Sequence, residues 1–199
     1  MDHDDRLAAD LARDLDGAFD GLVLAHQDRL YTIALRMLGD PRDAEEAAQD
    51  ALVRAYRALG TYDAGRIREL RVRGWLTTIV LNLCRTRGQR RAGRGAPPTS
   101  LDNDAAPALE PSAPRREAPP EVAERHAARD RWDARLAELP PVYRAAVVLR
   151  HVDGLSYPEA AAALGRPEGT VKAQVHRGIA LLRTMLEAEA RHELEEMTA

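Results

Sequence analysis

The stretch 155–182 constrains the fold of this chain more than any other, because it carries the signals for two helices joined by a tight turn. Ser156 and Glu159 have the S-x-x-E spacing of a capping box, which satisfies two unpaired amides at the start of a helix. Gly165 suits the left-handed conformation that ends a helix, and a second helix is expected to begin near Glu168. The sequence therefore predicts a helical hairpin with a short, defined turn.

The second helix of this hairpin has two unlike faces. Because successive residues are about 100° apart around a helix, the apolar stripe consists of Val171, Val175, Gly178 and Leu182. The opposite face carries Thr170, Lys172, Ala173, His176 and Arg177. A helix with a polar, basic front suits the major groove of DNA, and this is the layout of a helix-turn-helix with its second helix as the reader. The alternative is a surface hairpin whose charged face is only solvated.

The composition of the chain favours an all-α fold. Aromatic residues make up only 4% of its 199 residues, so the core is expected to consist of Leu, Val and Ala. The single cysteine, Cys84, excludes an internal disulfide, and without a Cys/His cluster the sequence predicts no metal and no cofactor. No apolar run approaches the length of a membrane span and no signal peptide is recognisable, so a cytoplasmic protein without membrane contact is expected.

A change in composition divides the chain. Residues 92–120 contain seven of the twelve prolines and seven alanines without apolar periodicity, which indicates a Pro/Ala-rich flexible linker. Helical patterns on either side predict two small helical domains, 21–91 and 121–186, the second of which contains the helix-turn-helix. Residues 1–20 are expected to form an acidic N-terminal segment and 187–199 an acidic, frayed tail. Before the helix-turn-helix, one helix face is expected to hold Trp132, Leu136 and Leu139.

Charge is segregated along the chain, although its net value is only −3. Residues 1–21 carry a net charge of −5, whereas residues 66–94, with nine arginines against one glutamate, carry +8. A compact basic stretch in a mildly acidic protein points to a polyanion bound at that site.

A helix is predicted over 41–59, with Asp40 as its N-cap, Pro41 in its first turn and Gly60 after its end. Its alanines share one face, and its outward residues are Asp43, Glu46, Gln49, Asp50 and Arg54. By themselves these residues are compatible with a solvated acidic face near a helix N-terminus, where the dipole favours carboxylates. Catalysis is disfavoured because no His, Cys or polar pocket residue accompanies the carboxylates, and the chain is not expected to be an enzyme.

A basic helix is predicted over 75–91, interrupted at Gly88. One narrow stripe of this helix holds Trp75, Thr78, Asn82, Arg85 and Gln89. Unstacked bases need an aromatic face, partners for their edges and cations for their phosphates, so the stripe favours single-stranded nucleic acid. The alternative is that the tryptophan is an ordinary core residue at a helix start. Cys84 falls on the apolar side and is expected to be inert.

Two stretches resemble extracytoplasmic-function (ECF) sigma factors, in the order in which that family carries them. The first stretch, which resembles the region-two domain, is ALRMLGDPRDAEEAAQDALVRAYRAL followed by RGWLTTIVLNLCRTRGQRR. The second stretch, which resembles the region-four domain, is LAELPPVYRAAVVLRHVDGLSYPEAAAALGRPEGTVKAQVHRGIALLR. The resemblance covers about 21–91 and 121–186.

The resemblance implies a transcription initiation factor that binds RNA polymerase core and directs it to promoters. It implies that helix 41–59 docks on the clamp helices of the largest polymerase subunit and that the flap of the second-largest subunit is a further contact. The face 170–177 would read the −35 element as duplex. The melted −10 element would be bound by Arg73, Trp75, Thr78, Asn82, Arg85 and Gln89. An anti-sigma factor is implied as the restraining partner.

Two other classes of protein share single features with this chain. A LuxR-type activator carries a similar TVK-containing helix, but it would need an upstream sensory or receiver domain whose strands are absent from this sequence. A nuclease would need a substrate pocket beside its carboxylates. Co-purification with core polymerase separates all three classes.

Overall fold

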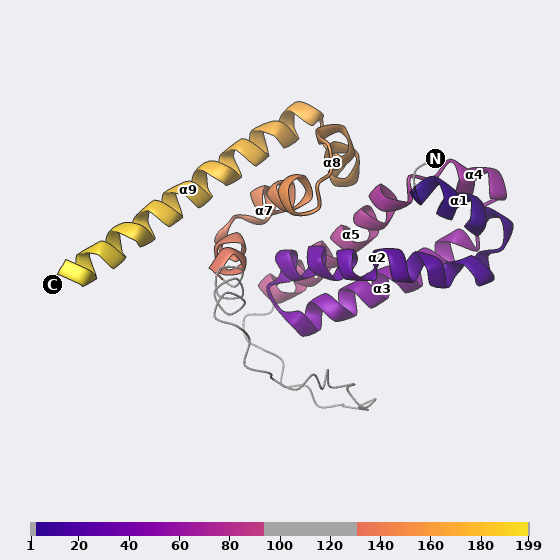
Figure 1. Ribbon diagram of the computed structural model, residues 1–199, viewed down its shortest axis with the longest axis horizontal. Coiled ribbons are helices and arrows are strands. Elements are labelled where there is room, and N and C mark those ends of the chain that lie inside the picture. The colour runs from indigo at the N-terminus through magenta and orange to yellow at the C-terminus, as the bar shows by residue number, and fades with distance from the viewer. Residues whose placement is uncertain (1–2, 94–130, 199) are drawn as a thin grey trace.

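The computed structural model describes residues 3–93 and 131–198, and every regular element in these two ranges is helical (Figure 1). This confirms the predicted all-α class. The first range forms α1 (His3–Arg13), α2 (Leu15–Leu38), α3 (Pro41–Leu59), α4 (Ala64–Arg68) and α5 (Val72–Gly93). The second range is helical over 131–138 and then forms α7 (Pro141–Val147), the π-helical turn η1 (Val148–Val152), α8 (Tyr157–Leu164) and α9 (Glu168–Thr198). The predicted linker, 92–120, lies outside the described residues except for its first two.

The junction between α2 and α3 has the predicted turn chemistry. Gly39 ends α2 in the left-handed conformation with a φ of 74°, and its N–H donates to the carbonyl of Leu35. Asp40 caps α3 by accepting a bond from the N–H of Asp43 at 3.0 Å, and Pro41 occupies the first turn. These caps fix the end of α2 and the start of α3. The alanine face of α3 lies against α2 and α5.

The acidic N-terminus belongs to the first group of helices, α1–α5, which we call the N-terminal domain. Leu7, Ala8 and Leu11 of α1 are buried, and the helix packs against α2 and α4. Asp14 then caps α2 by accepting a bond from the N–H of Gly17 at 3.1 Å. The structure therefore continues through residue 20, where the sequence suggested a boundary.

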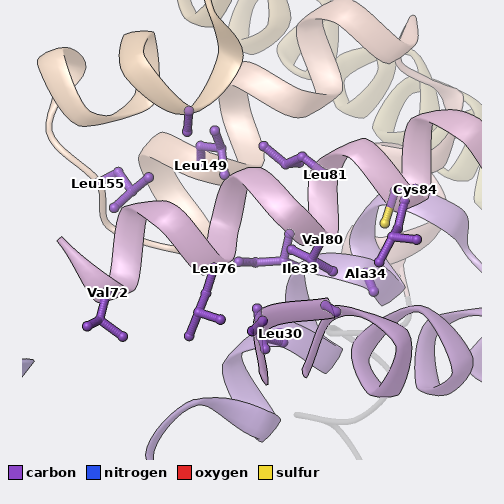
Figure 2. Close-up of a cluster of buried hydrophobic side chains, with 14 of the residues drawn as sticks. Leu30, Ile33, Ala34, Val72, Leu76, Val80, Leu81, Cys84, Leu149 and Leu155 are labelled. Atoms are coloured by element: carbon purple, nitrogen blue, oxygen red, sulfur yellow. The ribbon is translucent and has the colours of Figure 1, made fainter. Parts of the chain in front are cut away.

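Helix α5 lies at the centre of the molecule and has apolar neighbours on two sides. Figure 2 shows Leu30, Ile33 and Ala34 of α2 on one side of α5 and Leu149 and Leu155 on the other. All of them belong to one buried cluster. Helix α5 packs against α8, and α2 packs against η1 and α7. Residues 131–198, which we call the C-terminal domain, thus share a hydrophobic core with the N-terminal domain. The sequence pattern did not predict this shared core.

The turn η1 changes the direction of the chain just before the helix-turn-helix. The N–H of Asp153 reaches the carbonyl of Val148 at 2.9 Å, and the N–H of Leu155 reaches that of Leu149 at 2.9 Å. This wider turn buries the Asp153 side chain, which is only 1% exposed. Residue periodicity does not distinguish such a turn from a regular α-helix.

Two expectations about where helices break or fray are wrong. Helix α5 runs past Gly88 without a break, because one exposed glycine costs only about 1 kcal/mol of helix propensity. Helix α9 does not fray after Met185 but continues to Thr198. Arg135 contacts this helix beyond Met185, since its guanidinium lies 2.8 Å from the Glu189 carboxylate.

The apolar face expected before Pro140 is only partly buried. Leu136 and Leu139 lie in a small core with Leu182, whereas Trp132 is 49% exposed. The three residues share a helical face, but the buried cluster formed with α9 does not extend to the tryptophan.

Candidate nucleic-acid and polymerase interfaces

The helix-turn-helix has the predicted capping box. The N–H of Ser156 donates to Glu159 Oε2 at 2.8 Å, and the N–H of Glu159 donates to Ser156 Oγ at 3.4 Å. The Ser156 hydroxyl also donates to the Glu159 carboxylate at 2.6 Å, and this bond is the main reason why the pKa of Glu159 is lowered. Gly165 ends α8 in the left-handed conformation with a φ of 63°. The two ends of α8 are therefore fixed by local chemistry, as predicted.

Helix α9 has the predicted division between a buried and an exposed side. Val171, Val175 and Leu182 are buried, and Gly178 lies so close to α7 that a Cβ there would be 2.6 Å from Val147 Cγ2. The predicted −35 residues, Thr170, Lys172, Ala173, His176 and Arg177, are all exposed. One of them is internally paired: Lys172 Nζ lies 2.9 Å from the Glu168 carboxylate.

The structure separates the predicted −10 stripe of α5 into two parts. Trp75 and Thr78 are half-buried near the start of the helix, where the indole lies 6.2 Å from the ring of Tyr62. Asn82, Arg85 and Gln89 are exposed further along, and the Arg85 guanidinium donates to Asn82 Oδ1 at 3.0 Å.

The first part of the stripe lines a cleft of about 780 Å³ between the two domains, which we call the basic cleft. Its walls include Arg71, Arg73, Trp75 and Thr78 from the N-terminal domain and Pro158 and Glu159 from α8. Asp4 and Asp5 of α1 line the same cleft. The structure therefore brings Arg73, Trp75 and Thr78 together but places them opposite carboxylates of the chain itself.

Two residues of the second part, Arg85 and Gln89, line a different, more apolar cleft of about 550 Å³. Arg85 and Gln89 are joined there by Met37, Val142 and Cys84. The cysteine is buried, and burial raises the pKa of its thiol to about 12, which keeps it in the unreactive protonated form.

The predicted polymerase-binding face of α3 is exposed, apart from Asp43, which is half-buried. Arg87 of α5 bridges two of its acids, with 2.8 Å to Glu46 Oε2 and 2.8 Å to Asp50 Oδ2. The bond to Glu46 is the largest cause of the raised pKa of Arg87. Arg87, which local sequence pattern does not single out, therefore fixes the spacing of the two carboxylates.

A charged cluster joins the two domains. The Arg29 guanidinium donates from Nε to Asp153 Oδ1 at 2.6 Å, and from Nη2 to Asp153 Oδ2 at 2.6 Å and to Thr77 Oγ1 at 2.7 Å. Arg73 Nη2 donates to the Asp153 carbonyl and lies 3.7 Å from its carboxylate. Burial lowers the pKa of Arg29, although the bond to Asp153 opposes this effect. None of Arg29, Thr77 and Asp153 was expected to have a role.

Neither a metal site nor a membrane span is found in the described parts of the chain. Residues 3–93 and 131–198 contain no group of three or more His, Cys, Asp or Glu side chains placed to hold a metal ion. No helix within the same ranges combines the length and the apolar character needed to cross a bilayer.

The all-helical fold, the exposed face of α9 and the basic helix α5 together define a DNA-binding transcription protein built from two domains. Comparison with known proteins makes this specific. Residues 22–94 match the family described as Sigma-70 region 2, and residues 129–182 match Sigma-70, region 4. The chain belongs to the RNA polymerase sigma factors, in their ECF group. The LuxR-type alternative is not supported.

Individual relatives agree in both sequence and fold. The chain is 35% identical over 178 residues to the ECF RNA polymerase sigma factor SigE of Mycolicibacterium smegmatis, covering 89% of this chain and 64% of SigE. It is 30% identical to the ECF RNA polymerase sigma factor SigW of Bacillus subtilis, covering 85% of this chain and 89% of SigW. Among solved structures, CnrH in complex with the cytosolic domain of CnrY superimposes with a TM-score of 0.66 at 28% identity, covering 94% of this chain and 99% of CnrH.

Proposed function

We propose that this chain is a promoter-recognition subunit of RNA polymerase that reads the −35 element as duplex and the −10 element as a melted strand. The observation that carries the proposal is the presence of two unlike polar faces, one on α9 and one on α5, in a chain of this family. The protein acts in the cytoplasm, where polymerase and DNA are, and it is a binding factor without an enzymatic reaction of its own.

The face of α9 supplies contacts of two kinds to duplex DNA. Arg177 is exposed and suits guanine, whose O6 and N7 accept two parallel bonds from a guanidinium in the major groove. Thr170, Lys172 and His176 can position the helix on phosphates, which fixes register without reading sequence. Ala173 leaves space for the close approach of a base edge.

The face of α5 suits a strand whose bases have left the stack. Trp75 offers an aromatic surface on which a base can stack, and Asn82 offers both a donor and an acceptor to a base edge. Arg73 and Arg85 can hold phosphates, while Thr78 and Gln89 add polar contacts on either side. Capture of an unstacked base offsets part of the cost of melting, so the sequence preference at this element lies in the single strand.

Core polymerase is proposed to bind the exposed face of α3 through Glu46, Gln49, Asp50 and Arg54, with Asp43 at its edge. The clamp helices of the largest subunit and the flap of the second-largest are the proposed contacts. A protein partner of the anti-sigma kind completes the proposal, since the sigma factor RpoE of Bartonella quintana, which has a similar fold, was solved in complex with the anti-sigma factor NepR.

The test is assembly with core polymerase followed by run-off transcription on genomic fragments. Glu46→Arg combined with Asp50→Arg replaces two acidic side chains of the proposed interface with two basic ones. We expect the affinity for core polymerase to fall by at least ~10-fold. Glu187→Arg combined with Glu195→Arg on α9 is the matched control, because it reverses the same number of exposed charges elsewhere.

Arg87→Ala separates the partner contact from the internal bridge. It removes the ion pairs to Glu46 and Asp50 but leaves both carboxylates in place, so core binding should persist. Normal assembly of the double charge reversal with core would overturn the assignment of α3. Absence of any run-off product with the unchanged chain would overturn the function as a whole.

A further inference from the structure

The second cleft, of about 550 Å³, has a volume within the usual range of small-molecule sites. Its apolar wall includes Met37, Leu81 and Cys84 from the N-terminal domain. Val142 and Leu164 contribute to the same wall from the C-terminal domain. We call this space the apolar cleft. None of these five residues belongs to the proposed DNA or polymerase contacts.

Arg144 is a half-buried cation at the apolar cleft, and no carboxylate in the described parts of the chain pairs with it. Its guanidinium donates to three main-chain carbonyls, those of Met37 at 2.8 Å, Leu139 at 3.0 Å and Ala137. Burial lowers the pKa of Arg144, and no charge among the described residues opposes that effect. An anion in the cleft would stabilise this guanidinium, because a buried charge is costly unless an opposite charge lies near it.

Arg85 and Arg166 add two more positive charges to the lining of the apolar cleft. Arg85 donates to Asn82 Oδ1 at 3.0 Å, and Arg166 donates to Gln174 Oε1 at 3.0 Å. Both acceptors are uncharged amides. None of the described residues that line the apolar cleft is Asp or Glu, whereas the chain's own carboxylates line the basic cleft. The apolar cleft therefore combines an apolar wall with positive charge that no carboxylate of its lining offsets.

We propose that the apolar cleft binds a small anionic amphiphile of the fatty-acid class, with its carboxylate on the arginines and its alkyl chain along the apolar wall. A guanidinium can hold a carboxylate by two parallel hydrogen bonds, and the alkyl chain gains from each methylene removed from water. A protein partner is less suited to this space, since standard protein interfaces bury about 1,200–2,000 Å². Binding requires neither DNA nor polymerase, so the site is independent of the promoter contacts proposed above.

The test titrates the unchanged chain with octanoate, decanoate and decylammonium by calorimetry, at concentrations that leave its far-ultraviolet circular dichroism unchanged. Decanoate should bind about 15-fold more tightly than octanoate, because two more methylenes are removed from water. Decylammonium has the same alkyl chain and the opposite charge, so it should bind at least ~10-fold more weakly than decanoate.

A double arginine variant tests the recognition of charge. Arg85→Gln combined with Arg166→Gln removes two cations of the cleft and should weaken decanoate binding at least ~10-fold, the effect of one lost charge-assisted hydrogen bond. Arg90→Gln combined with Arg183→Gln is the matched control, because these exposed arginines of α5 and α9 do not line the cleft. Arg144 is left unchanged, since it also joins main-chain carbonyls of both domains.

Gly88→Leu tests the location of the ligand. Gly88 lines the apolar cleft, and nothing lies within 4 Å of a Cβ added there, so a leucine side chain has room to enter the cleft. Leucine also favours a helix more than glycine does, so α5 should persist. Gly88→Leu should abolish decanoate binding. Gly169→Leu is the matched control and should bind normally, because its added Cβ also meets nothing and Gly169 does not line the cleft.

Three results would each overturn part of the proposal. If the unchanged chain does not bind decanoate, the site is wrong. If decylammonium binds as tightly as decanoate, or the folded double arginine variant keeps full affinity, the ligand is not recognised as an anion. If Gly88→Leu binds decanoate normally, the ligand lies outside the apolar cleft. Circular dichroism identifies a variant that has lost its helices, and the other cleft variant then decides.

Discussion

Gly178 gives the sharpest test of how α9 is seated in the C-terminal domain. An added Cβ would lie 2.6 Å from Val147 Cγ2 and 3.4 Å from Tyr143 Cβ, so α9 would have to move away from α7. Overpacking of this kind costs about 1–3 kcal/mol, and the helix propensity of Ala over Gly returns about 1 kcal/mol. Gly178→Ala is therefore expected to leave the domain less stable or, at best, unchanged.

Gly88→Ala is the matched control, because it makes the same substitution inside α5 with nothing within 4 Å of the new Cβ. Its free energy of unfolding should rise only by the difference in helix propensity between Ala and Gly, up to about 1 kcal/mol. The difference between the two variants removes the propensity term and equals the overpacking cost, about 1–3 kcal/mol. Urea unfolding followed by far-ultraviolet circular dichroism measures both. An equal gain in stability for the two variants would falsify the close approach of α9 to α7.

Three further predictions concern the proposed DNA contacts and the cap of α8. Arg177→Ala should weaken binding to the cognate −35 duplex by about 1–3 kcal/mol and relax preference at one position, whereas a mere phosphate contact would weaken all sequences alike and reduce the salt slope by about one. Asn82→Ala should reduce open complexes, seen as permanganate-reactive thymines, while duplex binding by the C-terminal domain survives; promoters melted normally by a stable variant would contradict the single-strand assignment. Because the folded pKa of Glu159 is lowered, its stabilising contribution is present above the unfolded Glu pKa, about 4.3, and is lost as pH falls through the folded value. Ser156→Ala should weaken this pH dependence of the urea midpoint, and the idea fails if both proteins respond to acid alike.

The features that were predicted from the sequence are those whose causes lie within one or two helical turns. Asp40 and Ser156 each meet the N–H they cap three residues away, so the residue types alone reveal the contact. The faces of α3 and α9 follow from periodicity, because a helix repeats every 3.6 residues or so regardless of what it packs against. The exposure of the predicted −35 residues and the burial of the stripe behind them are both consequences of that rule.

The features that were missed depend on distant parts of the chain. Arg29 and Asp153 are 124 residues apart, and each has an ordinary reading in its own surroundings, one as a helix surface residue and the other as a turn residue. Arg87 likewise reads as one more basic residue until α3 is placed beside α5. Trp132 shows the converse, since its periodicity was right but the core ends before reaching it. Local pattern gives the face of a helix, whereas the extent of its burial depends on the neighbouring helix.

The contact between the two domains combines an apolar part and a charged part that act in different ways. Its apolar part is made of side chains such as Leu81, Leu149 and Leu155, which tolerate separation poorly but impose little geometry of their own. The Arg29–Asp153 pair behaves in the opposite way. Desolvation cancels much of the attraction between two buried charges, so the intact pair adds little net stability, while loss of one partner leaves an uncompensated charge and is strongly destabilising. A pair of this kind therefore selects one docked geometry of the two domains while adding little to the stability of their contact.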